Sequence, residues 1–169
     1  MIFIRKLSVL LIVGSWACHQ TDKPRPVSNA TKLTETAKIR LTDLTGQPKP
    51  LENYKGKTVF INFWATWCKP CLEEMPSIEK AQAMMNDKAI IFLLASSEGI
   101  EDIKEFSKNH NYQFMYMHLE NGETLNLQAL PTTFIIDPKG NLVFSEMGFR
   151  HWDETSNINL IKKINQQHD

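Results

Sequence analysis

Two apolar runs dominate the pattern of hydrophobic and polar positions along the chain. Residues 58–64, TVFINFW, are β-branched and aromatic, and residues 89–96, AIIFLLAS, are apolar almost without a break. A short continuous apolar run is typical of a strand covered on both faces in a parallel arrangement. Shorter strands are predicted at residues 114–119, 132–136 and 142–148, and the turn residues DPKGN join the last two.

Three other segments place their apolar residues at helical spacing. They are residues 72–85, 100–110 and 154–166, and a short helical turn is expected at 125–127. Pro76 lies inside the first of these helices, where it removes a backbone donor and should bend the axis. Ahead of them, residues 38–57 alternate, turn around Gly46 and return irregularly, which predicts an opening hairpin.

The order of these elements predicts the fold class. Strand, helix and strand, followed by a hairpin and a final helix, indicate an α/β sandwich with a mixed central β-sheet flanked by helices and an added N-terminal β-hairpin. A chain of 169 residues with 42% hydrophobic residues is long enough for one well-packed core. We therefore expect one folded domain, at residues 37–169.

The N-terminal residues have the order of a secretory signal. In residues 1–17, Arg5 and Lys6 precede a short apolar run and then small residues. That run is far shorter than the roughly 20 residues of a membrane-spanning helix. We therefore expect a signal peptide at 1–17 and an exported, periplasmic or extracytoplasmic protein.

The end of the signal is similar to a bacterial lipobox. Its sequence, SWAC, would make Cys18 the acylated N-terminus of the mature chain, although Ser15 stands where such boxes usually carry Leu. Ordinary cleavage after Ala17 is the alternative, and it would leave Cys18 as a free thiol. Residues 18–36 are mostly polar and contain two prolines, so they indicate a flexible tether between a lipid anchor in the membrane and the domain.

Charge and histidine placement exclude several function classes. Lys plus Arg (19) balance Asp plus Glu (19), so no global field favours nucleic acid. The five histidines stand singly or in the expected tails without ligand spacing, and we therefore expect no metal site: His19, His110, His118, His151 and His168.

The candidate chemistry lies in FWATWCKPCLEEMP, at residues 63–76. Cys68 and Cys71 stand two residues apart at the junction of a predicted strand and helix, where α/β proteins place their sites. The pair could be a structural bridge, half of a metal site, or a redox reagent. An oxidising compartment by itself favours a structural bridge.

Two motifs connect the sequence to a family. WCKPC after a buried strand, followed much later by LPTTF at residues 130–134, resembles the thioredoxin superfamily. The longer stretch VFINFWATWCKPCLEEMP resembles the TlpA and ResA type of membrane-anchored extracytoplasmic thiol-disulfide oxidoreductase. Asn62 stands where cytosolic thioredoxins keep a buried aspartate, and Glu74 matches a ResA-type glutamate. The resemblance covers Lys38 to the C-terminus and implies a thioredoxin-like sandwich.

The resemblance gives each cysteine a role. Cys68 is expected at a helix N-terminus, where unpaired amides and the helix dipole stabilise a thiolate, so it is the candidate nucleophile. Lys69 adds a nearby positive charge, and Pro70 loses no needed donor at a helix start. Cys71 is expected to be less exposed and to resolve the mixed disulfide. No cofactor is implied beyond this redox-active disulfide.

The resemblance also predicts the surroundings of the pair. Pro131 would follow a cis peptide bond and shape a substrate groove, and Trp67 would be exposed while Trp64 is as well placed for the core. Glu74 shares the helical face of Cys71, so it is a candidate catalytic group for proton transfer or tuning of the potential; the alternative is an exposed surface charge. The groove residues expected are Trp67, Lys69, Pro70, Leu130, Pro131 and Thr132.

The implied function is a reductase of disulfides in exported proteins. Cytochrome c maturation is the best single hypothesis, with apocytochrome c as substrate and a membrane thiol-disulfide carrier as electron donor. A Sco-like copper module would want three residues between the cysteines and a correctly placed histidine, and His151 keeps that alternative open. A peroxiredoxin-like peroxidase would want a threonine where Ala65 stands. An inert bridge is the remaining alternative. The helix dipole and Lys69 favour an oxidising potential, whereas an ionised Glu74 opposes it, so the direction of electron flow stays open.

Overall fold

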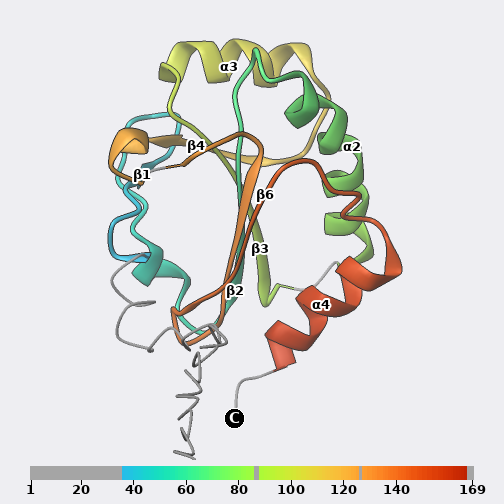
Figure 1. Cartoon of the computed structure of the whole chain (residues 1–169). Coiled ribbons are helices and arrows are strands. Elements are labelled where there is room, and N and C mark those ends of the chain that lie inside the picture. The colour runs from blue at the N-terminus through green and yellow to red at the C-terminus, as the bar shows by residue number, and fades with distance from the viewer. Residues whose placement is uncertain (1–35, 86–87, 126, 167–169) are drawn as a thin grey trace, which may run out of the picture.

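Six strands form one mixed sheet within the part of the chain that the computed structural model describes, residues 36–85, 88–125 and 127–166 (Figure 1). The strand order is β1-β4-β3-β2-β5-β6. β2, β3 and β4 are parallel, and the pairs β1/β4, β2/β5 and β5/β6 are antiparallel. The strands are β1 Leu41–Thr42, β2 Thr58–Phe63, β3 Ile90–Ser96, β4 Met115–Leu119, β5 Thr132–Ile136 and β6 Leu142–Met147.

The helices all contribute to one apolar core. They are α2 Lys69–Met84, α3 Ile100–Asn109 and α4 Thr155–Gln166. Met75 of α2, Ile103 of α3 and Ile161 of α4 are fully buried in the same cluster. Because side chains alternate along a strand, Phe60 of β2 faces this cluster while Ile61 joins a second one.

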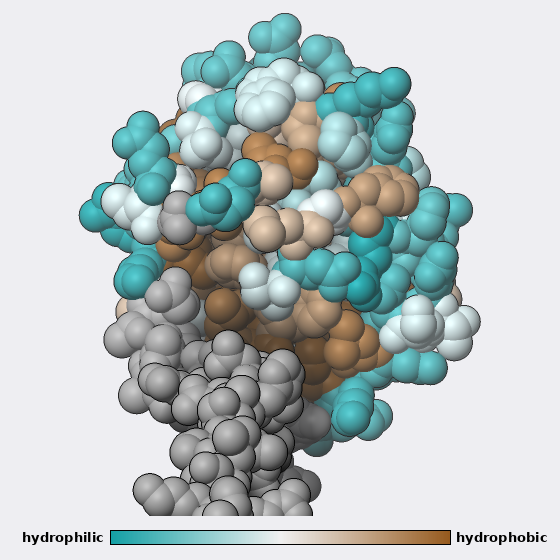
Figure 2. All heavy atoms as spheres, viewed as in Figure 1, coloured by the Kyte–Doolittle hydropathy of each residue, from teal (hydrophilic) through white to brown (hydrophobic). Residues whose placement is uncertain are grey.

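The second cluster is covered by short segments. The 3-10 helices η1 Leu51–Tyr54 and η2 Gly122–Leu125 pack against it. Figure 2 shows the surface from the viewpoint of Figure 1, with apolar residues gathered over the middle of the molecule and hydrophilic ones over α3. The expected mixed sheet flanked by helices is confirmed.

The central strands have the burial that their composition predicts. Every residue of β2 is buried, and β2 lies between β3 and β5 in the sheet. Phe63 at its end pairs with Ala95 of β3 and with Thr132 of β5. The end of β2 therefore lies beside the start of β5, at one end of the sheet. The motif WCKPC follows β2 there, and the motif LPTTF leads into β5.

The expected opening hairpin is reduced to a single bridge, between Thr42 and Pro48. The carboxylate of Asp43 accepts hydrogen bonds from the turn's backbone, and the main partner of β1 is β4 instead of a returning strand. The return contains Pro48 and Pro50, which lack the N–H groups that a ladder needs, and it continues as η1.

Two further boundaries differ from the prediction. Helix α2 begins at Lys69, three residues before the predicted start, because Cys68 caps it. The predicted turn at 125–127 is observed as η2, whose last residue is Leu125.

The N-terminal features lie outside the described residues: the signal at 1–17, Cys18 and most of the tether to residue 36. None of the helices among the described residues has the length and apolar character needed to cross a membrane.

Candidate active site

Cys68 and Cys71 form a disulfide at the junction of β2 and α2. Cys68 is the N-cap of α2, and its Sγ accepts a hydrogen bond from the backbone N–H of Cys71 at 3.3 Å. Pro70 lies in the first turn, where its missing N–H costs nothing. Both sulfur-bearing residues are buried in this oxidised form, at 4% and 0% exposure. One N–H of the helix start, that of Cys71, is thus directed at the sulfur of the first cysteine, where it can stabilise a thiolate.

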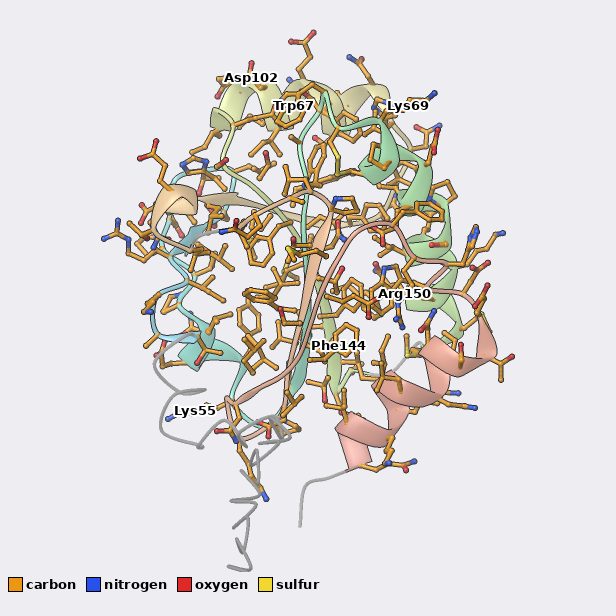
Figure 3. All side chains as sticks on the ribbon, in the orientation of Figure 1. Lys55, Trp67, Lys69, Asp102, Phe144 and Arg150 are labelled. Atoms are coloured by element: carbon orange, nitrogen blue, oxygen red, sulfur yellow. A yellow bond between two sulfur atoms is a disulfide. The ribbon has the colours of Figure 1, made fainter. Side chains whose placement is uncertain are left out.

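The two tryptophans of the motif separate as expected. The side chain of Trp67 is 74% exposed, whereas Trp64 is buried and packs against Phe106 and Tyr116. Lys69 is exposed, with its Nζ 3.8 Å from a carboxylate oxygen of Glu73. Figure 3 shows Trp67 and Lys69 at the same end of the molecule, above the sheet.

The second motif reaches the same end of the sheet. The Leu130–Pro131 peptide bond is cis, and Thr132 begins β5 beside Phe63. The carbonyl of Pro131 accepts a hydrogen bond from the N–H of Gly148 at 2.7 Å, and Leu130 packs against both core clusters. Thr132 is buried, and its hydroxyl donates to the backbone carbonyl of Ala129. The expected cis bond is therefore confirmed.

Glu74 lies in the core behind the cysteines, with a side chain that is 0% exposed. Its Oε1 accepts from the indole N–H of Trp152 at 2.6 Å and from the backbone N–H of Arg150 at 3.1 Å. Its Oε2 accepts from the side-chain amide of Asn62 at 3.0 Å. The alternative of an exposed surface charge is therefore wrong, because helix α2 turns this face toward β2 and the segment before α4.

Burial controls the ionisation of this carboxyl group. Desolvation raises the pKa of Glu74 from 4.5 to about 7, against the lowering effect of hydrogen bonds from Trp152, Asn62 and Arg150. A group with this pKa can hold or release a proton near neutral pH. It also lies one helical turn beyond Cys71, on the same face of α2.

The partners of Glu74 were not predicted as a group. Asn62 was noted only as a family marker, yet its amide donates to both Glu74 and Thr133, and its own Oδ1 is buried without a partner in the described structure. Trp152 and Arg150 precede α4, far away in the sequence. The alternation of β2 could have indicated Asn62, because it has the same parity as the helix-facing Phe60; no local signal indicates Trp152.

The side chain of Arg150 anchors the segment between β6 and α4, which donates hydrogen bonds to Glu74. Its guanidinium donates to both carboxylate oxygens of Glu146 and to Asn157 Oδ1. It also lies 5.5 Å from the ring centre of Phe144, and both residues are labelled in Figure 3. The side-chain charge of Arg150 is therefore paired with Glu146, while its backbone N–H serves Glu74.

The histidines within the described residues have individual surroundings. Nδ1 of His110 lies 2.9 Å from the carbonyl of Phe106, and Nδ1 of His118 lies 2.9 Å from the carbonyl of Glu98. His151 meets the ring of Phe149 edge to face. The described part of the chain holds no group of three or more His, Cys, Asp or Glu residues that could bind a metal ion.

The sequence profile of the AhpC/TSA family matches residues 33–145, more than half of the chain. The chain belongs to this family. The thioredoxin-like protein YneN of Bacillus subtilis (strain 168) is 31% identical over 139 residues, which cover 78% of this chain and 81% of YneN. The thiol-disulfide oxidoreductase ResA of Bacillus anthracis is 34% identical over 119 residues, 68% of each chain.

Solved structures give the same assignment. A thiol:disulfide interchange protein from a Bacteroides species superposes with a TM-score of 0.63 at 25% identity, over 78% of this chain and 88% of that chain. Together with the cysteine pair at disulfide distance, these relatives identify the AhpC/TSA member described here as a thioredoxin-like thiol-disulfide oxidoreductase.

Proposed function

We propose that the Cys68/Cys71 pair reduces disulfides of exported proteins by dithiol exchange. The observation that carries the exchange chemistry is the position of Cys68, whose sulfur caps α2 and accepts the N–H of Cys71; the reducing direction rests on the resemblance to the TlpA and ResA type. A sulfur held by helix-terminal amides is stabilised as a thiolate and is a good leaving group from a disulfide. The exposed Trp67 beside it offers an apolar contact for a protein substrate.

The exchange takes two steps. In the reduced protein, the Cys68 thiolate attacks one sulfur of the substrate disulfide; a mixed disulfide forms, and the other substrate sulfur leaves as a thiolate that takes up a proton. The Cys71 thiol then loses its proton and attacks Cys68 Sγ, which releases the second substrate thiol. The substrate gains two electrons and two protons, and the enzyme ends with the disulfide seen here.

Glu74 is our candidate for moving the proton of Cys71. Its pKa of about 7 lets its carboxylate accept a proton while its acid form returns one. The hydrogen bonds from Trp152, Arg150 and Asn62 hold the group in one orientation within the core.

The client and the cellular setting are part of the proposal. The similarity to proteins named ResA supports a substrate such as apocytochrome c, whose haem-binding cysteines must be reduced. A membrane thiol-disulfide carrier would then return electrons to the pair. The signal-like residues 1–17 and the lipobox-like Cys18 support an extracytoplasmic protein on a lipid anchor.

The peroxidase alternative has less support. A peroxiredoxin-like site wants a threonine three residues before the peroxidatic cysteine, and Ala65 stands there. The neighbouring Thr66 uses its hydroxyl to donate to Glu98 at 2.6 Å. The Sco-like alternative is disfavoured by the two-residue spacing of the cysteines.

The test is the reduction potential of the pair. The chain carries three cysteines, so Cys18→Ser leaves only Cys68 and Cys71 to equilibrate in thiol buffers. We expect a value near that of thioredoxin, about −270 mV, and a value near about −120 mV, that of DsbA, would make the protein an oxidant. A pair that cannot be reduced in these buffers would overturn the proposal in favour of a structural bridge.

A further inference from the structure

The cysteines are preceded by a tight turn that has few bonds of its own. The N–H of Cys68 donates to the carbonyl of Ala65 at 3.1 Å, so residues 65–68 form a turn with Thr66 and Trp67 at its centre. On the strand side, Trp64 N–H donates to the carbonyl of Ala95. The exposed Trp67 and the first cysteine thus lie on one short loop. The residues at the centre of this loop depend on another segment of the chain for further hydrogen bonds.

That contact comes from Glu98, in the segment between β3 and α3. Its Oε2 accepts from the backbone N–H of Thr66 at 2.7 Å, and its Oε1 accepts from the Thr66 hydroxyl at 2.6 Å. One carboxylate therefore receives both donors of the residue at the centre of the turn. Charge-assisted hydrogen bonds of this kind are the strong ones in proteins.

Glu98 is itself held in place from two directions. Ser96 Oγ donates to its Oε2 at 3.0 Å, and the Glu98 N–H donates back to the same hydroxyl at 3.2 Å. Its carbonyl lies 2.9 Å from Nδ1 of His118 on β4, which donates when Nδ1 carries the proton. These contacts hold the Glu98 carboxylate in one position, just beyond the end of β3.

From these contacts we infer that Glu98 is a positioning residue for disulfide exchange. It acts through Thr66: the carboxylate fixes the turn, and the turn sets where Trp67 and the sulfur of Cys68 meet a protein disulfide. This inference rests on the proposed function of the cysteine pair. It assigns Glu98 no contact with the substrate and no part in capping α2, whose N-cap is Cys68.

Two reactions separate positioning from thiol chemistry. Reduction of insulin requires a protein disulfide to dock beside Cys68, whereas iodoacetamide reaches the thiolate without docking. Insulin reduction is measured on the reduced full chain, with Glu98→Ala, Glu98→Gln and Thr66→Val compared with wild type. Alkylation is measured for the same changes in a Cys18→Ser, Cys71→Ser background, where Cys68 is the single thiol among the three cysteines of the sequence.

We expect Glu98→Ala to lower the rate constant for insulin reduction about 10-fold, the scale of a misplaced reacting group, with a change below about twofold in alkylation. Thr66→Val should give a smaller loss because it keeps the backbone donor, and Thr66→Ser should restore most of the rate. Glu101→Gln is the matched control, because that carboxylate is 84% exposed and bonds only Lys104 in the described contacts.

Three outcomes would overturn the inference. They are unchanged insulin reduction in Glu98→Ala, an equal loss in both reactions, and a loss that Glu101→Gln shares. If Glu98→Ala does not fold, the comparison of Thr66→Val with Thr66→Ser decides by the same criteria. Failure of the proposed function is distinguishable, because wild type itself would then not reduce insulin.

Discussion

At the scale of single residues, the two cysteines differ in what surrounds them. Cys68 caps the helix and follows the exposed Trp67, while Cys71 is fully buried one turn into α2. A nucleophile must be reachable by its substrate, and a resolving thiol must reach only the nucleophile. This asymmetry supports our proposal that Cys68 performs the first step.

We therefore predict different products from the two serine variants. Cys68→Ser should abolish disulfide reductase activity, because no thiolate remains at the helix start. Cys71→Ser should accumulate a mixed disulfide between Cys68 and the substrate, visible as a covalent adduct by mass spectrometry under non-reducing conditions. Normal turnover by Cys71→Ser would show that the roles are reversed or that Cys71 is not required.

Glu74 is the second residue whose environment makes a measurable prediction. Its pKa is raised from 4.5 in the unfolded chain to about 7 in the fold, so between these values the unfolded state binds fewer protons than the folded state. The contribution of Glu74 to the free energy of unfolding therefore falls by up to about 3 kcal/mol as the pH rises from 4.5 to 7. Above pH 7 it does not recover.

Glu74→Gln should remove this dependence. Chemical denaturation at pH 5 and pH 8 should show wild type losing stability relative to Glu74→Gln as pH rises. The exchange rate of wild type should also show a titration near pH 7 that the variant lacks. Gln is a fair control for shape, because the unpartnered Oδ1 of Asn62 could accept from the new amide. Identical pH profiles in the two proteins would mean that Glu74 does not titrate in this range.

At the scale of elements, the segment between β6 and α4 completes the site. It runs from Gly148, which bonds the carbonyl of Pro131, to Trp152, which bonds Glu74. Ser77, one residue after the internal Pro76 of α2, accepts from the N–H of Trp152. A single connection thus fastens the cis-proline strand, the active-site helix and the buried carboxyl group to one another.

We predict that Trp152→Phe raises the pKa of Glu74 further. The change removes the indole donor, which lowers this pKa, and leaves the desolvation that raises it. The ring packing against Phe60, with ring centres 4.8 Å apart, is partly kept. The titration seen in the exchange rate should move to higher pH. In a Glu74→Gln background the same substitution should produce no such shift, and an unchanged or lowered midpoint would contradict the assignment.

At the scale of the whole molecule, the described residues begin at Thr36, and what precedes them is known here only as a sequence pattern. We predict that mature Cys18 is N-terminal and lipid-modified. Intact-mass analysis of protein purified from bacterial membranes should show the added acyl mass, and Cys18→Ser should release the protein from the membrane fraction. An unmodified Cys18 would remove the anchor and support ordinary cleavage after Ala17.

The sequence by itself determined the elements whose causes are local. The apolar runs indicated β2 and β3 because buried strands need continuous hydrophobic surface, whereas the helical spacing placed the start of α2 at residue 72, three residues late. The exposure of Trp67 and the cis bond before Pro131 followed from motifs within a family. The opening hairpin was only partly right, because Pro48 and Pro50 withhold the donors that would extend it.

The tertiary structure alone decided what lies around these elements. Glu74 meets Trp152, and Thr66 meets Glu98, only because the fold brings distant segments together. Whether a carboxyl group is desolvated or bonded depends on its neighbours in space, and neither periodicity nor spacing encodes them. The sequence thus determined which residues form the candidate site. The packing of α2 against the sheet and its loops decided the surroundings of Glu74 and of Cys68.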